Sequence, residues 1–198
     1  MSELIGEGKA KGSIFAHAKE YINRTHGTGI WKEILGYLTE KDREFWEGSF
    51  NKTEWYPTPL LNRLIRIYDK LIGSGDFKSI EPVAEYIAEQ DLSPVFDIFI
   101  NLKNPVFILN SAPSLWSRYF NTGTVKIEIS DEKNNYYRFS LKELADDNLV
   151  SSRAICTWGV PTWLKKALLM AGAKEVIAKH TRCRYEGSNE CVLEVWWK

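Results

Sequence analysis

The sequence contains no apolar run of about 18 or more residues, which is the length that a membrane-spanning helix requires. Its N-terminal segment, MSELIGEGKAKGSIF, also lacks the apolar core of a signal peptide. We therefore expect a cytoplasmic protein without a membrane span.

No excess of charge of one sign is present, because 26 Lys and Arg residues balance 26 Asp and Glu residues. Proteins that bind nucleic acid or anionic membranes use a positive field to attract phosphate groups. The balanced charge predicts that nucleic acid is not a partner.

The patterns of common catalytic and nucleotide sites are missing. The glycines at 6–8 and 73–75 lack the strand-to-helix context and the spacing of a phosphate-binding loop. No nucleophile-elbow serine occurs, and the adjacent acids Asp146 and Asp147 are weak indicators of acid or base catalysis. The sequence predicts a protein that is not an enzyme.

Cysteine is scarce, with three residues in the chain. A reducing cytoplasm disfavours disulfides, and an odd number of cysteines fits free thiols or metal ligands better than a disulfide framework.

Aromatic and apolar residues are plentiful instead. The chain of 198 residues has 8 Trp, 9 Tyr and 9 Phe within an apolar fraction of 44%, enough for one sizeable core. We expect a single domain, 1–198, whose first part, 1–123, is mainly helical. Apolar spacing and capping residues predict helices over 13–25, 30–38, 58–72, 79–91, 93–100 and 104–119, with an irregular connection over 39–59.

The pattern changes to strands after residue 123. Val125, Ile127 and Ile129 alternate on one face of a strand, which pairs with a second strand over 137–141. A helix over 160–172 precedes two strands, 176–185 and 191–197, around a turn at 186–189. The predicted fold class is α+β, with a helical N-terminal half packed on a four-stranded antiparallel sheet from a ββαββ unit.

One group of residues has the chemistry of a metal site. His180, Cys183 and Cys191 lie on the last hairpin, and Cys156 precedes the helix beside it. Zinc prefers four thiolate and imidazole ligands in a tetrahedron, and four protein ligands leave no position for a catalytic water. We therefore expect a structural Zn²⁺ that closes the fold. The alternative is that the cysteines are small buried apolar residues and His180 an edge-strand residue.

The segment ICTWGVPTWLKKALLMAGAKEVIAKHTRCRYEGSNECVLEVWW resembles the 4-vinyl-reductase-like domain family. Gly159, Cys183, Gly187 and Cys191 match its pattern of helix glycine, strand cysteine, turn glycine and opening cysteine. The resemblance covers residues 124–198. It implies a fold shared with haem nitric-oxide-binding domains, TRAPP Golgi-transport subunits and the aromatic-effector sensors of σ54-dependent activators.

The σ54-type sensors also imply roles for individual residues. Their zinc ligands correspond to Cys156, Cys183 and Cys191, while His180 replaces an acidic ligand. His suits a soft, thiolate-rich zinc site at least as well as a carboxylate. Those sensors hold phenols with a His and Trp pair on the helices before the first hairpin. This chain has no His between His26 and His180, so the phenol clamp is absent.

Aromatic side chains on the helical side are candidates for the lining of an apolar ligand cavity, although ordinary core packing explains each of them as well. The candidates are Phe96, Phe99, Phe107, Trp116, Tyr119, Phe120, Trp158 and Trp163. His17 is a weaker candidate, as a haem ligand.

The resemblance and the aromatic content together predict a non-enzymatic binding or sensor domain for a small apolar ligand, either aromatic or tetrapyrrole-like. We expect it to act alone or through a partner, because no DNA-binding or ATPase segment accompanies it. Two alternatives remain. One is a protein-interaction or homodimerisation scaffold like the TRAPP subunits, and the other is an accessory factor in tetrapyrrole metabolism.

Overall fold

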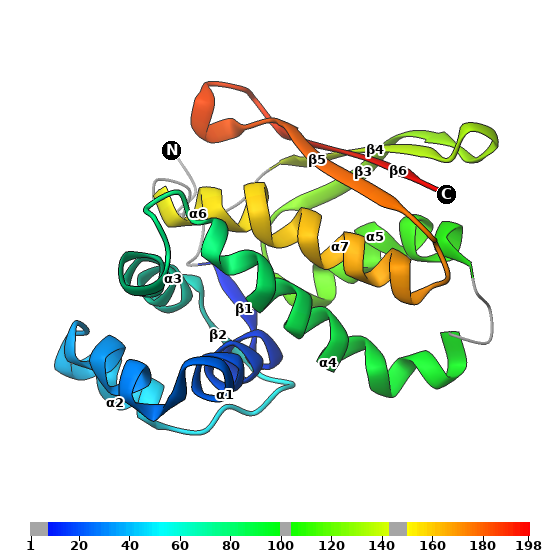
Figure 1. The fold of residues 1–198 in the computed structure, drawn as a ribbon. Coiled ribbons are helices and arrows are strands. Elements are labelled where there is room, and N and C mark those ends of the chain that lie inside the picture. The colour runs from blue at the N-terminus through cyan, green and yellow to red at the C-terminus, as the bar shows by residue number, and fades with distance from the viewer. Residues whose placement is uncertain (1–7, 100–103, 143–149) are drawn as a thin grey trace.

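The computed structural model describes residues 8–99, 104–142 and 150–198, with the backbone alone at 93–99, 150 and 151. Helices pack against one face of a four-stranded sheet, and α7 lies directly beneath that sheet (Figure 1). This arrangement confirms the expected α+β class. No helix in the described ranges is long and apolar enough to cross a membrane.

The N-terminal part is mainly helical, as predicted, with one short two-stranded sheet that was not expected. Its elements are β1 (Lys9–Lys11), α1 (Gly12–Gly36), α2 (Glu40–Glu47), β2 (Trp55–Pro57), α3 (Thr58–Ile72), a 3₁₀ turn (Lys78–Ile80), α4 (Glu81–Phe99) and α5 (Pro105–Tyr119). β1 and β2 pair antiparallel, which brings Lys9–Lys11 beside the segment that leads directly into α3.

α1 joins the two helices that were expected on either side of Gly27. The backbone at Gly27 has φ 79°, outside the helical region, so that α1 kinks there instead of ending. Glycine adopts positive φ without a steric penalty, which lets the chain bend and resume the helix.

The connection over 39–59 is more ordered than expected. Thr39 caps α2 by accepting a hydrogen bond from the Asp42 amide, and Trp46 on this helix is fully buried. Trp46 belongs to an aromatic group around Phe15 whose other members are Phe45, Phe50 and Tyr56. Burial of these rings orders a segment that has no long helical period of its own.

Two prolines do not break helices where a break was expected. α4 continues through Ser93 and Pro94, and α5 contains Pro113 in its interior. A proline removes one hydrogen bond from a helix, but each of these helices continues past its proline.

The C-terminal part forms the predicted ββαββ unit. Its elements are β3 (Thr124–Asp131), β4 (Tyr136–Lys142), α6 (Val150–Ala154), a π-helical turn (Ile155–Gly159), α7 (Val160–Met170), β5 (Val176–Arg182) and β6 (Cys191–Trp197). The strand order is β3-β4-β6-β5, and all neighbouring strands are antiparallel. α6 and the π-helical turn were not predicted.

A β-bulge in β3 alters the expected face of one residue. Ile127 pairs with Phe139, but Ile129 pairs with Arg138, so Glu128 is the additional residue. Ile129 is consequently 38% exposed instead of sharing the partly buried face of Val125 and Ile127.

A second bulge, in β5, positions the residues of the expected metal site. His180 pairs with Leu193 and Arg182 pairs with Val192, which leaves Thr181 as the additional residue. In a regular strand, residues three apart point to opposite faces. The additional residue restores His180 and Cys183 to the same face.

Candidate functional site

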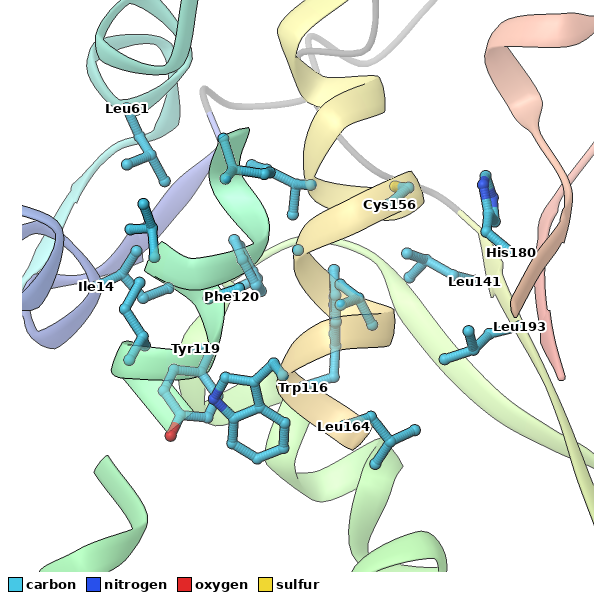
Figure 2. A pocket seen from close by; sticks show the side chains of 18 of the residues that line it. Ile14, Leu61, Trp116, Tyr119, Phe120, Leu141, Cys156, Leu164, His180 and Leu193 are labelled. Atoms are coloured by element: carbon cyan, nitrogen blue, oxygen red, sulfur yellow. The ribbon is translucent and has the colours of Figure 1, made fainter. Parts of the chain in front are cut away.

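A cavity of about 200 Å³ lies between the helices and the inner face of the sheet. Its walls come from α1, α3, α4, α5, the π-helical turn, α7 and all four strands of the large sheet. In Figure 2, Ile14 and Leu61 lie at one end of the lining and Cys156 and His180 at the other.

The cavity lining is almost entirely apolar. No Lys, Arg, Asp or Glu belongs to it among the residues whose side chains the structure describes. Its few polar side chains include Tyr68, Tyr119, Ser140 and His180. An ionised ligand group would find no opposite charge here, and burying an unpaired charge is costly. The cavity therefore selects neutral molecules.

Two tyrosines of the lining make hydrogen bonds to polar residues that are not themselves part of the lining. The Tyr68 hydroxyl lies 3.0 Å from His26 Nε2, and Tyr119 makes a hydrogen bond to Asp91. Burial is the largest cause that raises the pKa of both phenols, so both are neutral at ordinary pH.

Four of the eight aromatic residues predicted for a cavity line it, namely Trp116, Tyr119, Phe120 and Trp163. The Trp116 ring stacks on Phe120 with centroids 4.4 Å apart, and Tyr119 meets Trp163 edge-on at 5.6 Å.

The other four aromatic candidates do not contribute to the described lining. Phe107 is 40% exposed on the surface of α5. Trp158 points elsewhere, since its indole N–H donates to the Asp76 carbonyl. The side chains of Phe96 and Phe99 lie outside the described residues.

The aliphatic half of the lining was not predicted from the sequence. Ile14, Ala18 and Ile22 on α1 face the cavity together with Leu61 and Leu64 on α3. Their helical spacing was visible in the sequence, but the same spacing is typical of residues that pack tightly in a core. Spacing alone gives no signal that separates the two cases.

The expected metal ligands come together at the sheet end of the cavity. The donor atoms of His180, Cys183 and Cys191 all lie within 4.8 Å of one another. Cys156, from the π-helical turn, falls outside this group but makes a hydrogen bond to Cys191. All three cysteines are buried and free of disulfides.

The electrostatics of this cluster favour one thiolate. The hydrogen bond from Cys156 is the largest cause that lowers the pKa of Cys191, and His180 lowers it further, against the effect of burial. The pKa of Cys156 is raised in turn, chiefly by the same hydrogen bond, and burial raises the pKa of Cys183.

The donor set fits zinc. Zinc–thiolate bonds of about 2.3 Å and zinc–imidazole bonds of about 2.0–2.1 Å place tetrahedral ligands about 4 Å apart, so only a small contraction of the His180, Cys183 and Cys191 group is required. His180 Nδ1 lies 3.3 Å from Thr157 Oγ1, while the buried Nε2 makes no aligned hydrogen bond. That nitrogen is therefore available as a metal ligand.

His17 does not line the cavity. It is 2% exposed, with Nδ1 at 3.1 Å from Asp91 and Nε2 at 2.8 Å from the Lys52 ammonium. This buried position outside the cavity lining, between Asp91 and Lys52, gives no support to His17 as a haem ligand.

The fold is similar to that of H-NOX proteins. One similar structure is the Fe(II) unliganded protein from K. algicida, with 14% identity over 95% of this chain and 96% of that chain and a TM-score of 0.63. Another is the protein from S. oneidensis in the Fe(II)NO ligation state, with 13% identity, 95% and 99% coverage and a TM-score of 0.67. The IWP-051-bound H-NOX from Shewanella woodyi gives 11% identity, 93% coverage of both chains and a TM-score of 0.62.

The comparisons limit the relationship to the fold. Neither a protein-family model nor a curated protein sequence matches this chain. The structural matches bear out the expected likeness to the haem nitric-oxide-binding fold and leave the 4-vinyl-reductase-like resemblance unconfirmed.

The residues of this cavity do not fit a haem, although the fold implies one. Of the three histidines in the chain, only His180 belongs to the lining. No cationic side chain in the described lining could pair with two propionates, which arginine or lysine would hold. A cavity of about 150 Å³ holds one benzene, and a tetrapyrrole is several times larger. The pocket thus gives no support to a tetrapyrrole ligand.

Proposed function

We propose that this chain is one non-enzymatic domain that binds a small, neutral, apolar ligand and that carries Zn²⁺ on Cys156, His180, Cys183 and Cys191. The observation that carries the proposal is the apolar cavity of about 200 Å³. A cavity of about 150 Å³ suffices for benzene, so the ligand is the size of one substituted aromatic ring. Binding of such a ligand would let the domain act as a sensor or carrier.

Thermal unfolding in the presence of toluene and of benzoate tests the ligand class. A ligand at about 100 times its Kd stabilises the folded state by about 2.7 kcal/mol, which raises the Tm by several degrees. We expect toluene to raise the Tm and benzoate, a ring of similar size with a carboxylate, to leave it unchanged. Equal effects of the two compounds would contradict the proposal.

Elemental analysis of purified protein tests the metal. We expect about one zinc per chain in the natural protein and loss of zinc in Cys191→Ser, with a lower free energy of unfolding, because metal binding contributes to folding. Half-buried Ser188 in the preceding turn offers a control, since Ser188→Ala keeps every donor. Natural protein without zinc would overturn this part of the proposal.

A second candidate function is self-association through the outer face of the sheet. Ile177 is 53% exposed and pairs with Trp196, which is 36% exposed and contacts the Tyr136 ring at 5.2 Å. Neighbouring exposed apolar side chains on a sheet are typical of an interaction surface. Light scattering after size-exclusion chromatography should give a homodimer that Ile177→Lys dissociates and that Lys179→Gln, on the same strand, does not. A monomeric natural protein would exclude this candidate.

A further inference from the structure

The metal cluster and the ligand cavity share residues. His180 and Cys191 belong to the cluster and to the cavity lining, and Cys156, which is hydrogen-bonded to Cys191, belongs to the lining as well. A zinc ion held by these residues would sit in the end wall of the cavity. A molecule in the cavity would then reach the metal without crossing any other layer of protein.

The four donors are not equivalent. His180, Cys183 and Cys191 come from one hairpin and form the compact group, whereas Cys156 comes from the π-helical turn and falls outside that group. Zinc sites with three protein ligands keep their fourth position for an exchangeable ligand. Of the four donors, Cys156 is therefore the one that an incoming ligand would replace most easily.

The turn that carries Cys156 is itself part of the wall. Ile155, Cys156 and Gly159 all line the cavity, so a ligand there contacts this turn directly. Single turns of π-helix inside α-helical segments occur frequently at functional sites. If Cys156 left the metal, the turn could shift, and this movement would be transmitted to α7, which directly follows the turn in the chain.

We propose that the ligand of this domain carries a soft donor, a thiol, that binds zinc in place of Cys156. This inference rests on the proposed function. The Cys156 sulfur–zinc bond breaks and the bond from the ligand sulfur to zinc forms. The thiol proton of the ligand passes to the Cys156 sulfur, so the total charge of the buried site does not change. A neutral thiol on an apolar ring matches both the apolar lining and the metal.

Cobalt(II) in place of zinc makes the exchange visible, since the absorption bands of tetrahedral cobalt respond to each ligand. The full chain loaded with cobalt is titrated with phenylmethanethiol, whose thiol stays protonated at neutral pH, with ethylbenzene as the ring of matched shape and with 2-mercaptoethanol as a polar thiol. We expect saturable changes of the cobalt bands with phenylmethanethiol and none with ethylbenzene. 2-Mercaptoethanol should require concentrations at least about tenfold higher, because its polar end disfavours the cavity.

Cys156→Ala should bind phenylmethanethiol about tenfold more tightly, or about 1.4 kcal/mol, because no protein thiolate competes for the metal. The titration of the natural protein decides the matter even if this variant does not fold. If phenylmethanethiol raises the Tm as ethylbenzene does but leaves the cobalt bands unchanged, the exchange is overturned and the binding function stands. If neither compound raises the Tm, or if no cobalt binds, the proposed function fails together with this inference.

Discussion

At the scale of single residues, the geometry of the metal cluster depends on Thr181. This residue is the additional one in the β5 bulge, and it places His180 and Cys183 on the same face of the sheet. Its own side chain is exposed and is not one of the clustered donors. The position in the strand therefore matters more than the chemistry of the threonine.

Deletion of Thr181 should leave metal binding in place, because His180 and Cys183 are then two residues apart in a regular strand and still point to the same face. Deletion of Thr181 together with Arg182 should abolish it, because the two ligands become neighbours on opposite faces. Loss of an outer-shell partner costs about 10–100-fold in metal affinity, so loss of a ligand should cost more than about 100-fold. Competition with a chromophoric zinc chelator measures the affinity. Natural affinity in the folded double deletion, or loss of affinity in the folded single deletion, would refute the role of the bulge.

Glu194 on β6 offers a pH-dependent test of the sheet. The Tyr136 hydroxyl donates a hydrogen bond of 2.6 Å to Glu194, and Arg138 lies at 3.0 Å. The Tyr136 hydrogen bond is the largest cause that lowers the pKa of Glu194.

A carboxyl group with a lowered pKa in the folded state contributes stability above its unfolded pKa, which is about 4.3 for glutamate, and this stability is lost as the pH falls through the folded pKa. Glu194→Gln should therefore lose stability at neutral pH and flatten the decline below about pH 4.3. Urea unfolding of both proteins between neutral and acidic pH measures the difference. Parallel pH profiles for the two proteins would show that Glu194 makes no such contribution.

The sequence identified the donors of the cluster but not their arrangement. The spacing of His180, Cys183 and Cys191 around a turn predicted that they lie on one hairpin, and the structure brings them together. The bulge could not be predicted, because Thr181 is an ordinary strand residue with no glycine or proline beside it. Regular alternation would have placed Cys183 on the wrong face.

At the scale of elements, the kink in α1 is a property of one glycine. Gly27 and Gly29 were both expected to end the first helix, yet only Gly27 has positive φ, and α1 continues to Gly36. A sequence with two nearby glycines does not reveal which one departs from the helix. Both have open space around the position of a β-carbon, so their difference is one of backbone conformation.

Gly27→Ala and Gly29→Ala should consequently have opposite effects. Alanine at Gly27 is forced into positive φ, which costs about 1–2 kcal/mol, whereas alanine at Gly29 restricts the unfolded chain and stabilises by about 0.4–1 kcal/mol. Urea denaturation of the two variants compares their free energies of unfolding. Equal values for the two would show that the kink does not persist in solution.

The segment from Ile155 to Gly159 shows a second limit of element prediction. A helix beginning near Pro161 was expected, with Cys156 in the chain before it. The structure instead continues the helical backbone upstream as the π-helical turn and α6. Five residues of π-helix leave no distinct period in the sequence. The sequence therefore did not reveal how this turn orients the Cys156 side chain.

At the scale of the whole molecule, the aromatic residues divide between two places. Trp116, Tyr119, Phe120 and Trp163 line the cavity, as their predicted position between helices and sheet indicated. Another group, around Phe15, packs within the helical core and contributes no residue to the described cavity lining. Composition predicted many aromatic residues in the interior but could not divide them between a packed core and a cavity wall.

The cavity itself arises from the way in which the layers meet. The helical core around α1 and α3 and the core between α7 and the sheet are separate groups of buried residues, and the cavity draws its lining from both. Helix periods and strand alternation predict that each layer has an apolar face. They do not predict how completely the faces fill the space between them.

Isothermal titration calorimetry of toluene binding tests the central claim, an apolar ligand site in this cavity, most directly. The proteins to compare are the natural chain, Ala112→Leu, which adds volume to the α5 wall, and Ser114→Leu on the exposed side of the same helix. We predict one site per chain with a negative heat-capacity change, at least about tenfold weaker binding in Ala112→Leu and unchanged binding in Ser114→Leu. Absence of saturable binding to the natural chain, or equal affinity in Ala112→Leu, would contradict the account.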